Sequence, residues 1–424
     1  MRSLHNGGHR VVSLVLAGAV ASVTLATSQA MAAGNGHVGI APAVSGWKSS
    51  RLPMPAGALP NSFMPAAISC YSATVCSGGG GYASISGHHA ALLHWSTGVK
   101  WTAVEAQLPA GAADDPRAAV TSMSCPSASR CFAGGNYSDG GNRAMVLTWS
   151  SAAGWSVRKA PLPAGASPNP DAAVGGMSCP SVTWCTGVGQ YSDADGNEDP
   201  LLLRRTGGTW TAKAAPVRPP DGQHLTAGLT TVACPSTSRC FAGGWQYDSA
   251  GQPVPLMLTW FAGRWMAMKV PLPVGAAVEP SASIGGISCS TTAQCVAVGH
   301  YVGGRENQQG FILTWSGTSW TARKAPLPSD AGGNPWTELD AVSCPATSRC
   351  VAGGAYETAA SQSLGMLLTW SGKTWTAATA PAAAYRVSGI SCPSLAKCVA
   401  VSPGISRPVV LVGSQVLKPG HSPL

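Results

Sequence analysis

The chain has 424 residues and a formal net charge of +9 at pH 7, although only 10% of its residues are charged. Its 52 glycines and 33 prolines favour short strands and many turns over a helical fold. Beyond the N-terminal segment no stretch is apolar and long enough to cross a bilayer, so we expect no membrane span.

The first 32 residues have the pattern of a secretory signal peptide. Arg2 and Arg10 belong to a basic leader, residues 11–26 form a short apolar run, and Ala30 and Ala32 mark a small-residue cleavage site. An uncleaved membrane anchor is the alternative, but the run is short and rich in alanine, serine and threonine. We therefore predict a secreted, extracellular protein with a signal peptide at 1–32 and a linker at 33–45. Removal of the leader lowers the formal charge from +9 to +7.

The rest of the chain consists of one recurring unit, typified by residues 123–137. Each copy has a Cys-x5-Cys pair, followed in most copies by small residues with glycine and then a tyrosine. The first cysteines of six copies lie 54 or 55 residues apart, and the seventh follows 48 residues later. An even number of cysteines in an exported chain predicts disulfides, and the lack of a recurrent histidine disfavours zinc. The predicted bridges are Cys70–Cys76, Cys125–Cys131, Cys179–Cys185, Cys234–Cys240, Cys289–Cys295, Cys344–Cys350 and Cys392–Cys398.

The repeat predicts an all-β fold, a seven-bladed β-propeller over residues 46–415. Each copy offers four short strands, because an apolar run such as 145–149 and a Trp-to-Pro segment such as 155–163 follow the cysteine pair. Residues 46–55 form a fourth strand without the first three, and the last copy lacks a fourth strand. We expect the N-terminal strand to complete the last blade and close the ring. A β-solenoid is the alternative, and residues 416–424 are a C-terminal tail.

The order of a glycine doublet, a tyrosine and a tryptophan resembles the kelch motif. The matching residues in two copies are Gly134, Gly135, Tyr137, Trp155 and Pro163, and Gly243, Gly244, Tyr247, Trp265 and Pro273. The Ser-Cys-Pro-Ser-x-Ser-x-Cys phrase is similar to that of secreted bacterial repeat proteins. The cysteine pairs and the copies without the doublet depart from the kelch pattern. Kelch-like proteins include binding scaffolds and enzymes, so the resemblance implies the fold rather than one function.

Charges are expected to separate between the two faces of the ring. Sixteen of the seventeen carboxylates, all but Glu105, fall in segments that join the second strand to the third or one blade to the next. The opposite hairpins carry basic residues, namely Arg130, Arg239, Arg349 and Lys397 among others. This predicts an acidic loop face and a basic hairpin face, either merely solvated or used to recognise polar or anionic ligands. Scattered basic residues without an aromatic platform make nucleic acid an unexpected partner.

Positions that break the repeat are the candidate sites. Glu338 and Asp340 stand where other copies have small or uncharged residues, and Arg386 breaks the pattern in the next copy. We expect Glu338 and Arg386 to meet near the channel mouth, either as an interblade ion pair or as part of an acid–base site that includes Asp340. Two carboxylates also permit a glycosidase. The candidate binding residues are Trp336, Trp245 and His300.

A calcium loop is a further possibility at residues 192–199. The side chains of Asp193, Asp195, Asn197 and Asp199 alternate like the oxygen ligands of such a loop. The segment lacks glycine at the sixth position and glutamate at the twelfth, so an ordinary turn is the alternative. No other cofactor is expected.

Together these patterns predict a secreted, monomeric, non-catalytic recognition or scaffold protein that binds extracellular carbohydrate or protein. One alternative is a carbohydrate-active hydrolase or lyase with its site on the acidic loop face. Another is a purely structural envelope protein.

Overall fold

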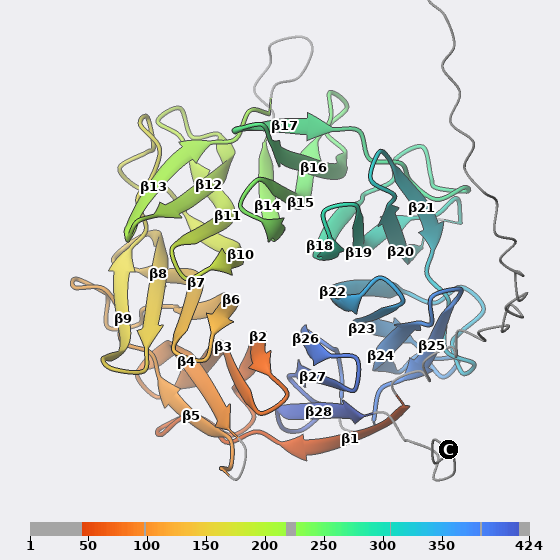
Figure 1. The fold of residues 1–424 in the computed structure, drawn as a ribbon, viewed down its shortest axis with the longest axis horizontal. Helices are drawn as coiled ribbons and strands as arrows, with labels where there is room; N and C mark the ends of the chain where they lie inside the picture. The colour runs from red at the N-terminus through yellow and green to blue at the C-terminus, as the bar shows by residue number, and fades with distance from the viewer. Residues whose placement is uncertain (1–44, 97–98, 218–225, 306, 382–383, 415–424) are drawn as a thin grey trace, which may run out of the picture. The chain divides into compact units, whose positions relative to one another are not determined.

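The computed structural model describes residues 45–96, 99–217, 226–305, 307–381 and 384–414. Within these ranges the regular structure is entirely β, with 28 strands in seven four-stranded antiparallel sheets arranged as a ring (Figure 1). The predicted seven-bladed β-propeller is therefore confirmed. No helix in this part of the chain is long and apolar enough to span a membrane. The predicted signal peptide, the linker as far as residue 44 and the tail lie outside the described residues.

Each blade runs from an innermost strand at the channel to an outermost strand at the rim. Blade 1 comprises β2 (Met64–Ser72), β3 (Val75–Ser84), β4 (Gly87–Ser96) and β5 (Thr102–Glu105). Blade 2 comprises β6 (Ala119–Ser127), β7 (Arg130–Ser138), β8 (Asn142–Ser150) and β9 (Gly154–Lys159). Blade 3 comprises β10 (Ala173–Ser181), β11 (Trp184–Ser192), β12 (Glu198–Thr206) and β13 (Thr209–Ala214). Blades 4 and 5 comprise β14 (Ala227–Ser236), β15 (Arg239–Tyr247), β16 (Pro253–Phe261) and β17 (Arg264–Met268); and β18 (Ser283–Thr291), β19 (Gln294–Val302), β20 (Gln308–Trp315) and β21 (Trp320–Lys324). Blades 6 and 7 comprise β22 (Thr337–Ala346), β23 (Arg349–Glu357), β24 (Ser363–Trp370) and β25 (Trp375–Thr379); and β26 (Gly389–Ser394), β27 (Lys397–Ser402), β28 (Val409–Ser414) and β1 (Ser45–Arg51).

The ring closes through the two ends of the described chain. Strand β1 pairs antiparallel with β28, so that Arg51 lies opposite Val409 and Lys48 opposite Val412. In Figure 1 the red β1 lies against the blue blade 7. The N-terminal strand β1 thus supplies the fourth strand of blade 7, as the complementary ends predicted.

All seven predicted disulfides are present, and they account for every cysteine. Each bridge joins the innermost strand of a blade to the second strand, across the hairpin between them. Seven such bridges indicate an oxidising or extracellular environment.

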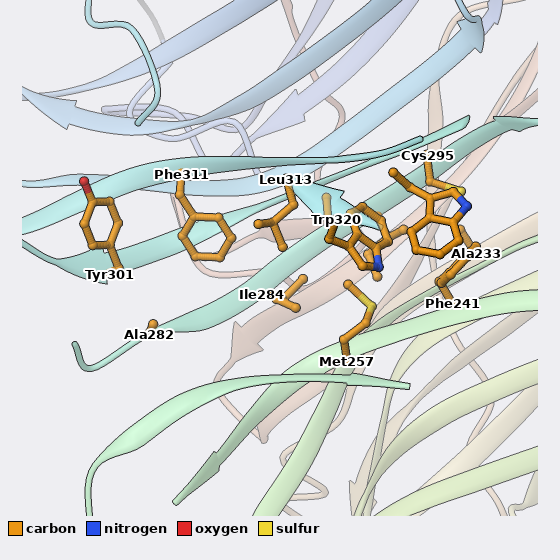
Figure 2. Packing of buried hydrophobic residues seen from close by; sticks show 13 residues of the cluster. Ala233, Phe241, Met257, Ala282, Ile284, Cys295, Tyr301, Phe311, Leu313 and Trp320 are labelled. Atoms are coloured by element: carbon orange, nitrogen blue, oxygen red, sulfur yellow. The ribbon is translucent and has the colours of Figure 1, made fainter. Parts of the chain in front are cut away.

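The hydrophobic core lies between neighbouring blades, at contacts that we call seams. At the seam of blades 4 and 5, Phe241 and Met257 pack with Ile284, Phe311 and Trp320 (Figure 2). Burial of one such large apolar side chain contributes about 1.5–3 kcal/mol. Each blade therefore depends on its neighbours for a core.

The glycine doublet lets the second strand approach its surroundings closely. A Cβ on Gly134 would lie 2.4 Å from Cγ1 of Val174 in the next blade, and one on Gly135 would lie 2.0 Å from the carbonyl oxygen of Ala119. Side chains at these two places would push the blades or strands apart. The doublet is thus a packing requirement of the blade.

The repeat tyrosine is buried in five blades, with exposed fractions of 0–3% for Tyr82, Tyr137, Tyr191, Tyr301 and Tyr356. Blade 4 differs from the expectation. Trp245 lies opposite Gly228, as Asn136 lies opposite Ala119, so Gln246 occupies the register of Tyr137. Tyr247 is one residue further along and 38% exposed. Its assignment as the repeat tyrosine was wrong, because a shift of one residue turns a strand side chain to the other face.

Serine hydroxyls tie the innermost strands together around the channel. The serine before the first cysteine accepts a hydrogen bond of 2.9–3.0 Å from the backbone N–H of the next blade's first cysteine. The six acceptors are Ser391, Ser69, Ser124, Ser178, Ser288 and Ser343. Blade 4 has Ala233 at this place, and Thr231 accepts from Ile287 instead, at 3.2 Å. The Ser-Cys phrase of the repeat is therefore an interblade contact.

Candidate functional site at the channel mouth

The central channel contains a cavity of about 440 Å³, lined mainly by the innermost strands of the seven blades. The residue four before the first cysteine contributes to this lining in every blade. Its occupants are Ala66, Thr121, Gly175, Thr230, Gly285, Asp340 and Ser388. In the first six blades it lies at a β-bulge, where the strand pairing shifts by one residue. A bulge redirects a side chain, so the side chain at this position does not follow the regular in-and-out alternation of the strand.

Most occupants of the bulge are small or hold the neighbouring blade by a hydroxyl. Thr121 donates to the carbonyl oxygen of Val174, and Ser388 donates to that of Pro65 at 2.6 Å. A Cβ on Gly285 would lie 2.6 Å from the carbonyl oxygen of Leu339. Close interblade approach therefore explains small residues here, and Asp340 is the exception.

Asp340 forms a bidentate contact with Arg386 of blade 7. The Nε of Arg386 donates to Oδ2 of Asp340 at 2.6 Å, and its Nη2 donates to Oδ1. Such paired, charge-assisted bonds fix both side chains in one orientation. The structure thus joins blades 6 and 7 at the channel mouth.

Glu338 and His300 extend this contact to blade 5. The Nη2 of Arg386 lies 3.0 Å from Oε1 of Glu338, and Nδ1 of His300 lies 3.6 Å from the same oxygen. The expected meeting of Glu338 and Arg386 is confirmed. We call His300, Glu338, Asp340 and Arg386 the mouth cluster. Their side chains are 15–33% exposed, so a ligand can reach them while the protein holds them in place.

Burial governs ionisation within the mouth cluster. Burial raises the pKa of Asp340 to about 6, with a further rise from Glu338, against the hydrogen bonds and charge of Arg386. Burial lowers the pKa of His300, and Arg386 acts in the same direction, whereas Glu338 opposes it. Burial also disfavours charge on Arg386, but its bonds to Asp340 and the charge of Glu338 keep its pKa above the usual range. At neutral pH the imidazole is therefore neutral and Asp340 is ionised.

Trp245 lies next to the mouth cluster in the blade order. It occupies the same register in β15 as His300 does in β19, opposite Gly228 and Ser283 respectively. The half-buried indole contacts Tyr247 edge-to-face, with ring centroids 5.5 Å apart. Blades 4 to 7 therefore place an aromatic residue, a histidine, two carboxylates and an arginine in succession.

Trp336 is not among the described residues that line the channel cavity. It immediately precedes β22, is half-buried, and accepts a hydrogen bond from the backbone N–H of Glu357 through its carbonyl oxygen at 2.9 Å. The structure therefore places Trp336 at the start of β22 but outside the lining of the channel cavity, and its role in binding stays a prediction.

The predicted calcium loop is organised by hydrogen bonds of its own. Oδ1 of Asp193 accepts from the backbone N–H groups of Asp195 and Asn197 at 3.0 and 2.8 Å. Asp199 accepts instead from the hydroxyl of Tyr191, at 3.2 Å. Across the described ranges no group of three or more His, Cys, Asp or Glu side chains could hold a metal ion. Asp193 therefore makes hydrogen bonds within the turn, and calcium binding at this loop stays a prediction.

The basic hairpin residues have a role that sequence reasoning missed. The guanidinium of Arg239 lies 5.2 Å from the ring centroid of Phe241 and 5.5 Å from that of Trp315 in the next blade. Likewise Nζ of Lys397 lies 4.3 Å from the centroid of Trp95. Cation–π contacts of this kind stabilise a seam. The signal available in the sequence was that a basic hairpin residue and a tryptophan both recur in the repeat.

Glu105 lies at the end of β5, where Oε2 accepts a hydrogen bond from the hydroxyl of Tyr82 at 3.0 Å. Tyr82 is close to the loop that joins β3 to β4. The one carboxylate assigned away from the acidic loop face therefore lies at the loop end of its blade.

Comparisons with known proteins assign no function to the chain, so the function is argued from the residues described above. No family model matches the chain, and no curated protein matches it. Among solved structures, AofleA from Arthrobotrys oligospora has a TM-score of 0.43 at 9% identity, over 78% of this chain and 89% of its own. A Trypanosoma rangeli sialidase in complex with 2,3-difluorosialic acid scores 0.44 at 10% identity, over 88% of this chain and 60% of its own. The Hadza microbial sialidase Hz136 scores 0.46 at 10% identity, over 77% and 73%. Scores this low establish no relationship, so the architecture rests on the strand pairing itself.

Proposed function

We propose that the protein is a secreted, non-catalytic recognition propeller that binds an extracellular carbohydrate at its channel mouth. The observation that carries this proposal is the mouth cluster, where one arginine holds two carboxylates beside a cavity of about 440 Å³. Carboxylates accept hydrogen bonds from sugar hydroxyls and a guanidinium donates to ring and hydroxyl oxygens. Trp245 adds an aromatic surface of the kind that packs on sugar rings.

The arrangement favours binding over hydrolysis. Glycosidase carboxyl groups flank the scissile bond, about 5–5.5 Å or 6.5–9.5 Å apart, with the substrate between them. Here Glu338 and Asp340 converge on the same nitrogen of Arg386, so both are engaged and no substrate bond separates them. The raised pKa of Asp340 is the one feature that favours the alternative, a hydrolase or lyase with Asp340 as acid.

Export, the monomeric state and the kelch-like relationship belong to the same proposal. The seven disulfides support export through the leader at 1–32. The repeated glycine doublet supports a kelch-like blade, with the disulfide as an addition. A protein ligand remains an alternative to carbohydrate, and nucleic acid is not an expected partner.

The test is glycan-array screening followed by calorimetric titration of each hit. The variant Asp340→Thr introduces the residue that Thr121 and Thr230 supply at the same bulge, and Glu338→Ser copies Ser283. Because each variant removes a carboxylate that accepts charge-assisted hydrogen bonds from the sugar hydroxyls, we expect each variant to raise Kd for the glycan about tenfold. Trp245→Asn, which copies Asn136, tests the aromatic contact. Asp195→Ser, an exposed carboxylate on the same face, is the control and should leave Kd unchanged.

Each outcome decides between the functions. Selective binding that both mouth-cluster variants weaken, without turnover, supports recognition. Turnover of a bound glycan that Asp340→Asn abolishes supports the hydrolase or lyase. Absence of binding to any glycan by the wild-type protein overturns both and favours a structural envelope protein.

A further inference from the structure

A second exception to the repeat lies at the seam between blades 3 and 4. Four blades have threonine followed by tryptophan near the end of the third strand, but blade 3 has Arg204 and Arg205 there. Trp184 also occupies the place that Arg130 and Arg239 take in the adjacent blades. Three departures from the repeat thus fall on one blade.

These residues surround a groove of about 330 Å³, which we call the lateral groove. Its walls include Trp184 and Arg204 of blade 3 and Trp260 and Trp265 of blade 4. The equivalent seam of blades 5 and 6 has Gln294, Thr314, Trp370 and Trp375 at the same four places, and its cavity is only about 50 Å³. The larger volume therefore occurs at the seam where blade 3 departs from the repeat, and it is absent from the regular seam of blades 5 and 6.

The charge of the lateral groove has one sign. Arg204, Lys213 and Arg264 line it and are exposed, and no carboxylate is among its described lining residues. A groove with three cations attracts anions and focuses its field on them.

Arg204 is held in a geometry suited to anion recognition. Its guanidinium carbon lies 5.6 Å from the ring centroid of Trp184 and 5.1 Å from that of Trp260. Contacts with two indole rings fix the guanidinium and leave N–H donors at its edge for a carboxylate or sulfate. Residues of β13, the outermost strand of its blade, also line the groove.

We propose that the lateral groove is a second ligand site, which binds acidic sugar units of an anionic polysaccharide. The half-buried rings of Trp260 and Trp265 pack on the apolar faces of the sugars, and Arg204, Lys213 and Arg264 pair with their anionic groups. This site is separate from the mouth cluster and does not depend on it.

The experiment is isothermal titration of the full protein with polygalacturonate, dextran sulfate and neutral dextran, with tryptophan fluorescence as a second readout. Arg204→Thr restores the threonine of Thr148 and Thr314 at an exposed position, so the fold should tolerate it. Loss of its charge-assisted contact should raise Kd for the anionic polymers about tenfold. Arg204→Lys keeps the charge but loses the planar fork, and should bind more weakly than the wild type.

The matched control is Arg158→Thr, which removes an exposed cation at the place in β9 that Lys213 occupies in β13. It should change Kd less than about twofold, because a distant surface charge contributes only screened attraction. Stronger binding of polygalacturonate identifies carboxylate sugars as the ligand, and stronger binding of dextran sulfate identifies sulfated ones.

Three results would overturn the proposal. One is equal affinity of the wild-type protein for dextran and for the anionic polymers. Another is an equal effect of Arg204→Thr and Arg158→Thr. The third is tighter, Arg204-dependent binding of a single-stranded oligonucleotide, which would make the groove a nucleic-acid site.

Discussion

The backbone N–H of Cys70 donates a 2.9 Å hydrogen bond to the hydroxyl of Ser391, across 321 residues of sequence. The same bond joins five other pairs of neighbouring blades, and here it joins the last blade to the first. The innermost strands are thus locked at the channel, while β1 and β28 close the ring at its rim.

Replacement of Ser391 should weaken this closure. Ser391→Ala removes the acceptor for a partly buried N–H, so we expect the free energy of unfolding to fall by about 1 kcal/mol. Urea unfolding followed by tryptophan fluorescence measures the change. Ser151→Ala, in the exposed β8–β9 turn, is the control. Equal midpoints for the two variants would show that the closing bond contributes nothing.

Removal of one disulfide should cost more than removal of one hydrogen bond. Cys392 and Cys398 are six residues apart, and a bridge over so short a loop is worth about 2 kcal/mol in the chain-entropy account. The double variant Cys392→Ala/Cys398→Ala should lower the urea midpoint accordingly. A midpoint like that of the wild type would contradict the stabilising role of the bridge.

The glycine doublet should be intolerant of even one methyl group. A Cβ on Gly135 would lie 2.0 Å from a backbone oxygen of the paired strand, which cannot move without disturbing the blade. We expect Gly135→Ala to cost about 1–3 kcal/mol, the usual range for overpacking. Gly333→Ala is the control, because its Cβ would meet nothing within 4 Å, and thermal unfolding should separate the two variants. Similar melting temperatures would refute the close-packing argument.

His300 should make stability fall in acid. Its pKa is lowered in the folded protein, so below its ordinary value of 6.5 the unfolded chain binds protons that the folded protein does not. The stability of the wild type relative to His300→Gln should therefore be constant above pH 6.5 and decrease as the pH falls below it. Gln190 occupies the equivalent place in blade 3, so the variant should fold. Chemical unfolding between pH 4 and pH 8 gives the comparison, and parallel curves would contradict it.

Asp340 should show the opposite dependence. Its pKa rises from 3.8 to about 6, so between these values the unfolded chain loses a proton that the folded protein keeps. The stability of the wild type relative to Asp340→Asn should therefore fall by about 3 kcal/mol as the pH rises from about 4 to about 6. The same unfolding series measures it. An increase over that range would show that Arg386 outweighs burial at this carboxyl.

The seven blades, the closing strand and the disulfide pairing could all be predicted from the sequence. Each of these features depends on local spacing that the chain repeats, such as two cysteines six residues apart in one hairpin. Residues that recur in every copy are structural, and those that break the repeat stand out as exceptions. Glu338 and Arg386 are two such exceptions in neighbouring blades, so their meeting could be predicted. A periodic pattern needs no knowledge of side-chain geometry.

Only the tertiary structure decided how the exceptions are used. The bulge that aims Asp340 at Arg386 is a shift in strand pairing, and the same one-residue sensitivity placed Gln246 rather than Tyr247 in the buried register. The mouth cluster and the lateral groove each join side chains from different blades, whose distances depend on how the blades pack. Sequence spacing fixes which residue follows which along a strand, whereas contacts across a seam are set by bulges, close backbone approach and the shapes of the neighbouring side chains.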